Sequence, residues 1–313
     1  MSLLLAGAGQ MAVNYATVLS AMNRPFATVG RSLDAVERFR SATGLQASTG
    51  GIARYLETEG APEHAIVAVD IPNLAEVAHQ LLAAGTRRIL VEKPVGLTKD
   101  AIEAVRTVSS SVGAEVYAAY NRRFYSSVRA ARQAIQGDGG LLALDFEFTE
   151  WIDRLPLAAM RSDVKQRWAV ANSSHVIDLA FHLAGRPSDW RARRSGALDW
   201  HPSGAHFVGS GTTERGVLFT YQATWGAPGR WGLTLKTSER RLRLQPLERL
   251  LVSVDGIHDI AAEVDDELDE KFKPGLYRQV EAFLDAENGH LCSIDEHASM
   301  MHVYAEIAGY AHG

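Results

Sequence analysis

The sequence contains only one cysteine, Cys292, in 313 residues. A single cysteine cannot form a disulfide within the chain, and no Cys-x-x-Cys or cysteine–histidine spacing indicates structural zinc, so we expect no metal site. The longest apolar runs fall well short of the roughly 20 residues that span a bilayer. The first residues also lack the basic segment and cleavage pattern of a secretory signal. These absences favour an intracellular protein, and we expect it in the cytoplasm, without a membrane partner.

An excess of positive charge is missing as well. The 32 Lys and Arg residues are outnumbered by 37 Asp and Glu residues, which gives a formal net charge of −5. Binding to nucleic acid requires a clustered basic face. Arginines do gather at residues 191–194 and 240–243, but such short clusters are typical of solvated faces. We therefore expect a small-molecule partner and no nucleic acid.

Short apolar runs alternate with helical patterns over residues 1–120. Such alternation predicts βαβ units around a parallel sheet, which is a doubly wound Rossmann domain. The continuous apolar run at residues 65–69 is typical of a strand buried on both faces. The expected strands are 3–6, 25–29, 64–69, 87–91 and 115–119, and the expected helices are 11–22, 33–43, 74–84 and 99–112.

The pattern changes after residue 120. Helices are expected at 125–136, 174–183, 277–286 and 298–308, and a strand at 142–150. From residue 206 to 254, polar and β-branched or aromatic residues alternate between glycine-containing turns, which predicts an open, mostly antiparallel sheet. The acidic stretch 263–271 is expected to be a solvated loop or the start of a helix. The length also favours two domains. We place a dinucleotide-binding domain at residues 1–121 and an α/β domain for substrate binding and oligomerisation at 122–313.

A glycine turn follows the first expected strand. Gly7, Gly9 and Ala12 form a Gly-x-Gly-x-x-Ala pattern that opens the first helix, with Gln10 and Met11 between them. The first glycine permits a tight turn, and the second lets the backbone approach a pyrophosphate. The N-terminus of the helix then offers its N–H groups to the phosphates. This position on the first strand favours a dinucleotide site over an ordinary glycine-rich turn.

The end of the second expected strand indicates which dinucleotide binds. NAD sites usually place Asp or Glu there, whereas this strand is followed by Gly30, Arg31 and Ser32. Arg31 can pair with a 2′-phosphate, Ser32 can add a hydroxyl, and Gly30 leaves space beside them. The alternative is that Arg31 only covers the surface and Ser32 caps the next helix. We expect NADP, with NAD as the second choice.

Two further segments carry a resemblance to a known family. Glu92, Lys93 and Pro94 end the fourth expected strand, where an open α/β sheet places its ligand crevice. With the segment from Asn172 to Asp178, they make the chain resemble the Gfo/Idh/MocA family of oxidoreductases, over essentially its whole length. Supporting matches are Pro72, Asn73, Asn121, Arg122, Arg123 and Phe124.

The resemblance implies roles for these residues. It assigns catalysis to Lys93 and His175, and it implies that Pro72, Asn73, Glu92 and Lys93 join the cofactor site. It also implies a homo-oligomer, either a dimer or a tetramer, and often a cis peptide bond before Pro94. The expected substrate-binding residues are Asn121, Arg123, Trp168, Asn172 and His175.

The chemistry of the two catalytic candidates is consistent with these roles. Oxidation of an alcohol by hydride transfer requires removal of the hydroxyl proton, and reduction requires its return. A histidine exchanges protons near neutral pH because its ordinary pKa is about 6.5. A lysine ammonium can stabilise the developing alkoxide and favour a neutral histidine. We expect Glu92 to orient Lys93.

One position departs from the family pattern. Members commonly have an aspartate four residues before the histidine, whereas this chain has Ala171 followed by Asn172. An amide can donate a hydrogen bond but cannot stabilise an imidazolium as a carboxylate does. Asp178 can supply a carboxylate one turn later or can be structural.

The expected function is NADP(H)-dependent hydride transfer to or from a sugar or sugar-derived polyol or keto compound. The sugar substrate is implied by the resemblance alone. Two alternatives keep the same cofactor site. One is a hydrolase that uses a bound nicotinamide for a transient oxidation, and the other is a sensor that binds dinucleotide and sugar without turnover.

Overall fold

The computed structural model describes residues 2–310, which group into two compact units. The first unit runs to Tyr120 and also contains Lys271–Ser299. The second contains Asn121–Glu270 and the residues from Met300. The expected domains were contiguous, 1–121 and 122–313, whereas residues 271–299 belong to the first compact unit.

The first unit contains a six-stranded sheet in the order β14-β5-β4-β3-β1-β2. Five strands are parallel, and the edge strand β14 is antiparallel to β5. The parallel Rossmann sheet is therefore confirmed, while β14 is an addition that the sequence pattern did not predict. The strands are β1 (Leu3–Ala6), β2 (Ala27–Val29), β3 (His64–Val67), β4 (Arg88–Glu92), β5 (Glu115–Ala119) and β14 (Cys292–Ser293).

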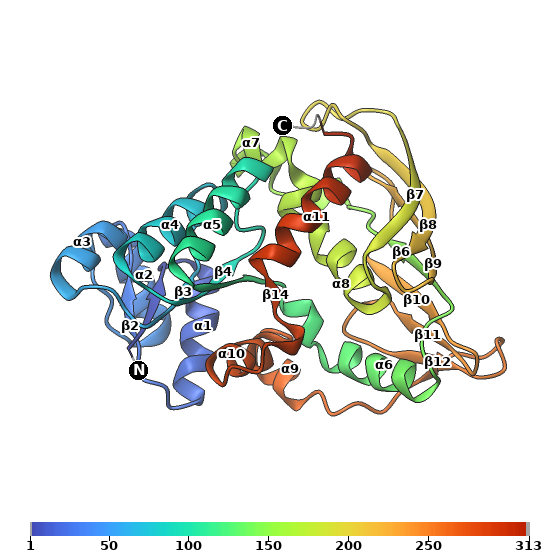
Figure 1. Ribbon diagram of the computed structural model, residues 1–313, viewed down its shortest axis with the longest axis horizontal. Helices are drawn as coiled ribbons and strands as arrows, with labels where there is room; N and C mark the ends of the chain where they lie inside the picture. Colours follow the sequence, from blue (N-terminus) through green and yellow to red (C-terminus); the bar gives the residue numbers. More distant parts are fainter. Residues whose placement is uncertain (1, 311–313) are drawn as a thin grey trace. The chain divides into compact units, whose positions relative to one another are not determined.

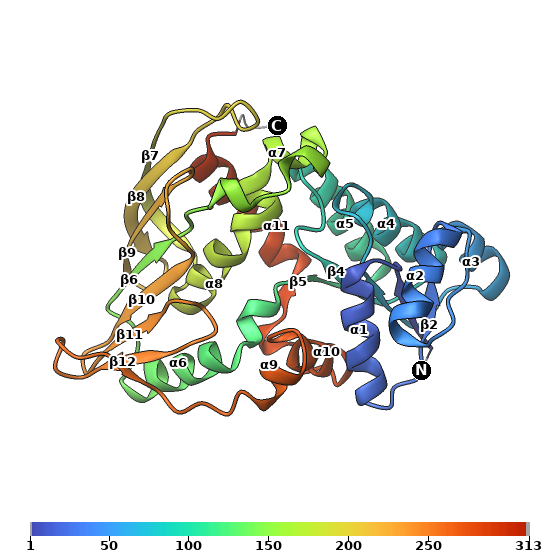
Figure 2. The ribbon, with the colours of Figure 1, turned by 180° about the vertical axis from the view of Figure 1, so that it is seen from behind.

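Helices cover both faces of this sheet (Figures 1 and 2). One of them, α3, was not expected, because only Ile52 of its side chains is buried and glycines flank it. The helix α1 packs against α10, and α4 packs against α3 and α5. The helices are α1 (Gln10–Ala21), α2 (Leu33–Thr43), α3 (Gly51–Glu59), α4 (Leu74–Ala84), α5 (Lys99–Val112), α10 (Leu276–Leu284) and the first part of α11 (Ile294–Ala308).

A buried arginine holds the segment Lys271–Ser299, which belongs to the first unit, against the sheet. Arg88, the first residue of β4, is 6% exposed, and its Nε donates to the backbone oxygen of Phe283 at 2.9 Å. Its Nη2 donates to Asn288 Oδ1 at 2.6 Å, and it pairs with Glu115. A buried charge needs such partners. Arg88 therefore links the end of α10 and the residues after it to the sheet of the first unit.

The second unit contains an eight-stranded sheet in the order β13-β12-β11-β10-β6-β9-β8-β7. Every neighbouring pair is antiparallel except β6 and β9, which confirms a mostly antiparallel open sheet. The arginine cluster at residues 191–194 lies on the edge strand β7, where charged side chains discourage further strand pairing. The strands are β6 (Ala143–Glu147), β7 (Pro187–Ser195), β8 (His206–Thr213), β9 (Leu218–Thr224), β10 (Gly232–Lys236), β11 (Arg241–Leu244), β12 (Leu251–Ser253) and β13 (Ile260–Ala261).

One face of this second sheet carries the core of the unit. Phe146 on β6 and Phe219 on β9 contact Phe181, with ring centroids 5.6 and 5.1 Å apart, so α8 packs across the middle of the sheet. The acidic stretch 263–271 was expected to be a solvated loop or the start of a helix, and it ends in the short helix α9 (Glu267–Lys271). The other helices of the unit are α6 (Ser126–Gly137), α7 (Ser162–Gln166), α8 (Ser174–Ala184) and the last part of α11.

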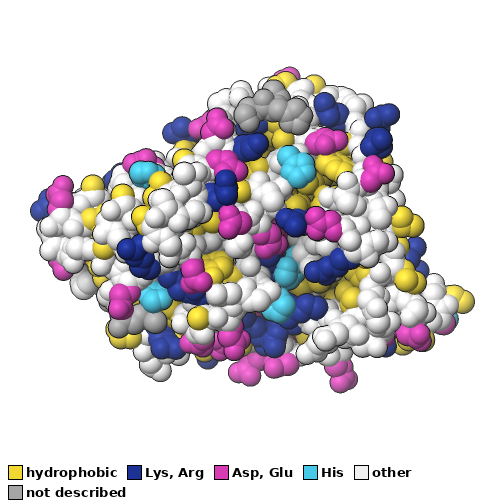
Figure 3. All heavy atoms as spheres, in the orientation of Figure 1, with side chains coloured by type: hydrophobic (Ala, Val, Ile, Leu, Met, Phe, Trp, Pro, Cys, Tyr) yellow, Lys and Arg dark blue, Asp and Glu magenta, His cyan; other side chains and the backbone are white. Residues whose placement is uncertain are grey.

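The surface carries charges of both signs. Figure 3 shows Lys and Arg side chains interspersed with Asp and Glu side chains over the face it presents. Among the helices of residues 2–310, none is both long and apolar enough to cross a bilayer.

Candidate functional site

The two glycines of the first turn differ in what surrounds them. Gly7 has φ +133°, and a Cβ there would lie 2.2 Å from the backbone oxygen of Ala68. Gly9 immediately precedes α1, and a Cβ there would meet nothing within 4 Å. Gly7 is therefore required by the fold, because only glycine avoids this contact. Gly9 keeps the space in front of the helix open.

A cavity of about 680 Å³ lies at this turn. That volume is within the range of about 300–1,000 Å³ typical of ligand sites. Met11, Gly30 and Pro72, also predicted for the cofactor site, are not among the described residues that line it. Predicted cofactor residues that do line it are Gly7, Gly9, Gln10, Arg31, Ser32 and Asn73.

Gly30 has a different role from the one expected. A Cβ at this position would lie 2.7 Å from Val36 Cγ2 and 2.9 Å from the Cβ of Ala8. The space beside Gly30 is thus filled by protein, and the glycine serves packing of α2 against the glycine turn. It does not keep space for a phosphate.

Two arginines line the cavity near the end of β2. Arg31 follows this strand, and Arg38 lies on α2 and was not singled out from the sequence. Neither forms an ion pair with another described residue. The Ser32 hydroxyl accepts a hydrogen bond from Ala35 N at 3.3 Å, so this serine does cap α2. No local signal links Arg38 to Arg31, because Arg31 precedes α2 and helical spacing does not apply to it.

Glu92 is the last residue of β4 and is held by the first helix. The Tyr15 hydroxyl on α1 donates to Glu92 Oε1 at 2.7 Å, and Tyr15 is fully buried. Burial raises the pKa of Glu92, while the Tyr15 hydrogen bond and the Lys93 ammonium lower it. The strand and the helix together therefore fix the backbone from which Lys93 extends.

The turn after Lys93 is held by a histidine that sequence reasoning missed. The Lys93–Pro94 peptide bond is cis. His297 on α11 is fully buried, and its Nε2 donates to the Pro94 backbone oxygen at 2.6 Å. No sequence signal links these residues, because they are 203 positions apart. Glu92 and Lys93 are not among the described residues that line the glycine-turn cavity.

In the second unit, His175 is the second residue of α8 and is only 7% exposed. It follows a π-helical turn, Ala169–Ser173, that is hydrogen-bonded to Tyr310. Ala169 N donates to the Tyr310 hydroxyl at 3.1 Å, and this hydroxyl lies 2.9 Å from His201 Nε2. The backbone leading to His175 is thus anchored on a buried pair of side chains.

A carboxylate lies against this same turn. Glu150, which follows β6, is 5% exposed, and its Oε1 accepts hydrogen bonds from Asn172 Nδ2 at 3.0 Å and Ser173 Oγ at 2.7 Å. Burial raises its pKa, and the bonds from Ser173 and Asn172 lower it. The missing aspartate at position 171 therefore does not leave the turn without an acidic group.

Arg123 and Asp178 form a buried ion pair. Arg123 Nε donates to Asp178 Oδ2 at 2.8 Å, and Nη2 lies 2.5 Å from Oδ1; both side chains are 2% exposed. A buried bidentate pair satisfies both charges. Asp178 is thus engaged in an ion pair with Arg123, which holds α8.

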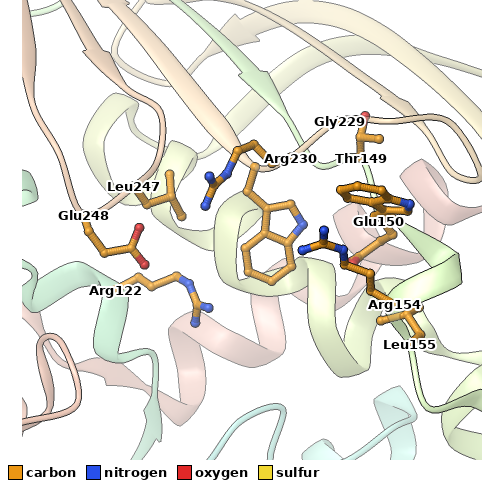
Figure 4. A pocket seen from close by; sticks show the side chains of 11 residues that line it. Arg122, Thr149, Glu150, Arg154, Leu155, Gly229, Arg230, Leu247 and Glu248 are labelled. Carbon is orange, nitrogen blue, oxygen red and sulfur yellow. The ribbon is translucent and has the colours of Figure 1, made fainter.

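A pocket of about 460 Å³ lies in the second unit beside Glu150 (Figure 4). Trp231 lines this pocket, and its ring centroid lies 6.1 Å from that of the catalytic candidate His175. The predicted substrate residues Asn121, Arg123, Trp168, Asn172 and His175 are outside its described lining. The lining consists of Arg122, Thr149, Glu150, Trp151, Arg154, Leu155, Gly229, Arg230, Trp231, Leu247 and Glu248.

No cluster of three or more His, Cys, Asp or Glu side chains able to hold a metal ion occurs within the described part of the chain. The glycine-turn cavity suits a dinucleotide by a different chemistry. The open space at Gly9 lies against a helix N-terminus, which binds phosphate through backbone N–H groups.

No family model and no curated protein matches the sequence. Solved structures are similar over nearly the whole chain. The UDP-N-acetylglucosamine 3-dehydrogenase from Acidithiobacillus ferrooxidans has a TM-score of 0.78 at 16% identity, covering 100% of this chain and 98% of that one. An oxidoreductase from Agrobacterium radiobacter, solved with NAD+, L-tartaric acid and magnesium, has a TM-score of 0.82 at 13% identity, covering 99% and 96%.

A dehydrogenase from Bordetella pertussis, solved with NADH and UDP-GlcNAcA, has a TM-score of 0.75 at 15% identity, covering 99% of this chain and 96% of that one. At these identities the likeness concerns the fold. The chain has the fold of these oxidoreductases, which confirms the fold that the resemblance to the Gfo/Idh/MocA family implied.

Proposed function

We propose that this chain is an NADP(H)-dependent oxidoreductase of the Gfo/Idh/MocA type that interconverts a hydroxyl and a carbonyl group on a sugar or sugar derivative. The observation that carries the proposal is the cavity at the glycine turn, where Gly9 leaves open space before α1. A pyrophosphate bound there would accept hydrogen bonds from the N-terminus of the helix. Gly7, Gln10 and Asn73 would complete the lining of the cofactor site.

NADP is preferred to NAD because of the charges next to the end of β2. No carboxylate ends β2, and Arg31 and Arg38 line the cavity beyond it. A guanidinium forms paired hydrogen bonds with a phosphate, which matches a 2′-phosphate and gives a ribose hydroxyl no comparable advantage.

We assign the proton transfer to His175 and the stabilisation of the substrate oxygen to Lys93. Histidine exchanges a proton with a hydroxyl near neutral pH, and an ammonium stabilises the negative charge that develops on the oxygen. When bound, the nicotinamide supplies the hydride acceptor or donor. Glu92, fixed by Tyr15, would orient Lys93.

Ligands of the similar structures support the same class of reaction. One was solved with NAD+ and another with NADH, and two involve UDP-linked sugars by name or by bound ligand. For this chain we therefore propose a pyridine nucleotide and a sugar derivative as the reacting pair.

We further propose that the chain forms a homo-oligomer through the open face of the second unit's sheet. Val208 on β8 and Leu218 on β9 are 54% and 61% exposed, opposite to the buried face. Light scattering at several concentrations would test this, and a monomer throughout would remove the proposal.

The function is tested in two steps. NADPH and NADH binding is followed by fluorescence, and turnover is then measured with a panel of keto-sugars, sugar nucleotides and sugar alcohols. We expect tighter binding of NADPH and its consumption with at least one substrate. A protein that binds neither nucleotide would overturn the proposal. Binding without turnover would indicate a sensor, and a copurified nicotinamide without net consumption would indicate the hydrolase.

A further inference from the structure

The lining of the second unit's pocket contains several arginines. Arg122, Arg154 and Arg230 reach it from three separate segments, and Figure 4 shows their side chains approaching from different directions. Arg154 ends the 3₁₀ turn Ile152–Arg154, and Arg230 lies in the loop between β9 and β10. Neither of these two arginines forms an ion pair with another described residue.

Two carboxylates also line the pocket, but neither forms an ion pair with Arg154 or Arg230. Glu150 accepts hydrogen bonds from Asn172 and Ser173 of its own unit. Burial also raises the pKa of Glu150, which disfavours its charged form. Glu248 is exposed at the pocket. Arg154 and Arg230 thus share the pocket lining with one exposed carboxylate and one buried carboxyl that is already hydrogen-bonded.

Two of these arginines lie over the rings of tryptophan side chains. The Arg154 guanidinium carbon lies 4.0 Å from the centroid of the Trp151 ring, and that of Arg122 lies 4.8 Å from the Trp231 ring. Stacking uses the face of a guanidinium, while its N–H donors lie along the edge. A stacked arginine can thus still form a fork with a carboxylate or a phosphate. The indoles also give the pocket a flat apolar wall beside which a sugar ring can pack.

We propose that this pocket binds an anionic sugar derivative, with the carboxylate or phosphate of the substrate held by Arg154 and Arg230. The inference deepens the proposed function and rests on it, because the anionic group then orients the substrate beside Trp231, which contacts His175. Thr149 and Glu150 line the same pocket and offer oxygen atoms for sugar hydroxyl groups.

The test is calorimetric titration of the full chain with D-glucuronate, D-glucose 6-phosphate and D-glucose, with NADP+ present. Hydrogen bonds to charged groups contribute about 1.5–3 kcal/mol, so at least one charged sugar should bind about tenfold or more tightly than glucose. Tighter binding of glucuronate identifies a carboxylate, and tighter binding of the sugar phosphate identifies a phosphate. Equal binding of all three sugars, or no binding of any, would overturn the proposal.

Variants locate the site. Arg154→Gln and Arg230→Gln should each weaken binding of the charged sugar about tenfold and leave glucose binding unchanged. Arg191→Gln on β7 removes the same charge from the second unit at a position that is 79% exposed, and should bind as wild type. Both arginine variants binding the charged sugar as wild type would place the anion elsewhere and overturn the proposal.

Binding of NADPH is measured separately by fluorescence in the same protein preparations. Binding of NADPH without preference for charged sugars would overturn this inference and keep the proposed function. A preference for charged sugars that depends on Arg154 and Arg230, in a protein that binds no nicotinamide, would support the anion site and overturn the proposed function.

Discussion

The side-chain amide of Asn172 donates to the carboxylate of Glu150, with 3.0 Å between Nδ2 and Oε1, across 22 positions of sequence. This contact brings an acidic group to the turn that precedes His175. The chain therefore combines Ala171, at the position where the resembling family commonly has aspartate, with a glutamate from another element. Glu150 also lines the second unit's pocket.

The first prediction concerns Glu150→Gln. Glutamine keeps an oxygen that can accept from Asn172 and Ser173 but cannot carry a charge. Losing a residue that orients a catalytic group typically costs ten- to hundredfold, so we expect turnover to fall by about tenfold or more. Glu263→Gln, at an exposed glutamate of the second unit outside the described pocket lining, is the matched control and should keep wild-type turnover. Unchanged turnover in Glu150→Gln would show that this carboxylate is structural.

The same variant has an expected effect on stability. Because burial raises the pKa of Glu150, its contribution to folding is fully present below its unfolded pKa, about 4.3, and is lost as pH rises through the folded pKa. Glutamine does not titrate. The unfolding free energy of the variant, relative to wild type, should therefore increase from about pH 4.5 to pH 8 in urea titrations. A constant difference over this range would contradict the expectation.

The second prediction tests the catalytic assignment. Lys93→Ala and His175→Ala should each lower turnover about a hundredfold or more, because proton transfer and charge stabilisation each contribute at that scale. NADPH should bind both variants nearly as it binds wild type, because neither residue lines the glycine-turn cavity. Lys99→Ala, an exposed lysine at the start of α5, is the control and should keep full activity. Wild-type turnover in either catalytic variant would remove that residue from the reaction.

Part of this arrangement could be predicted from the sequence because its signals are local. The glycine turn, the residues after β4 and the start of α8 are short segments in which spacing along the chain sets position in space. The parallel sheet followed from continuous apolar runs for the same reason. These patterns also indicated that residues 206–254 form antiparallel strands.

The remainder depends on contacts between distant segments. Glu150 was predicted only as the end of a strand, and nothing in its neighbourhood indicates that it meets Asn172. His297 lies 203 positions from Pro94, and Arg88 lies 195 positions from Phe283, so the return of residues 271–299 to the first unit had no local signature. Arg154 ends a short 3₁₀ turn and Arg230 lies in a loop, so neither has a periodic pattern around it, and only the folded second unit brings them to one pocket.

The third prediction separates the roles of the two turn glycines. Gly9→Ala should leave the unfolding free energy within about 0.5 kcal/mol of wild type, because its Cβ meets nothing within 4 Å. It should nevertheless weaken NADPH binding about tenfold or more, because the methyl group occupies the space of the pyrophosphate. Gly7→Ala should be destabilised by roughly 1–3 kcal/mol, because its Cβ would lie 2.2 Å from Ala68 O. Normal NADPH affinity in Gly9→Ala would exclude a dinucleotide across this turn.

The fourth prediction concerns the choice of cofactor. Arg31→Gln should raise the dissociation constant for NADPH about tenfold or more and leave that for NADH nearly unchanged, since only NADPH carries the 2′-phosphate. Arg38→Gln should act in the same direction, because Arg38 lines the same cavity. Arg40→Gln, on α2 but outside the described lining, should have no effect. Equal weakening of NADH and NADPH by Arg31→Gln would contradict a 2′-phosphate contact.

The last prediction concerns pH and the anchor of the π-helical turn. His201 is fully buried, and its Nδ1 lies 2.8 Å from the Gly204 backbone oxygen, which can only accept, so Nδ1 carries the proton. Nε2 then accepts from the Tyr310 hydroxyl in the neutral ring. Burial lowers the pKa of His201, and the Gly204 hydrogen bond opposes this. Because the folded pKa lies below the unfolded value of about 6.5, the stabilisation is present above 6.5 and is lost as pH falls towards the folded pKa.

The unfolding free energy of the wild type should therefore decrease between about pH 7.5 and pH 5.5. His201→Gln should be about 1–3 kcal/mol less stable than wild type at pH 7.5. Its unfolding free energy should then decrease less over the same pH range. His206→Gln, an exposed histidine on β8, should keep the wild-type dependence. Because Tyr310 also accepts from Ala169 N, loss of this anchor loosens the turn before His175, and turnover should fall together with stability at low pH. A pH dependence in His201→Gln identical to that of wild type would show that other groups cause it.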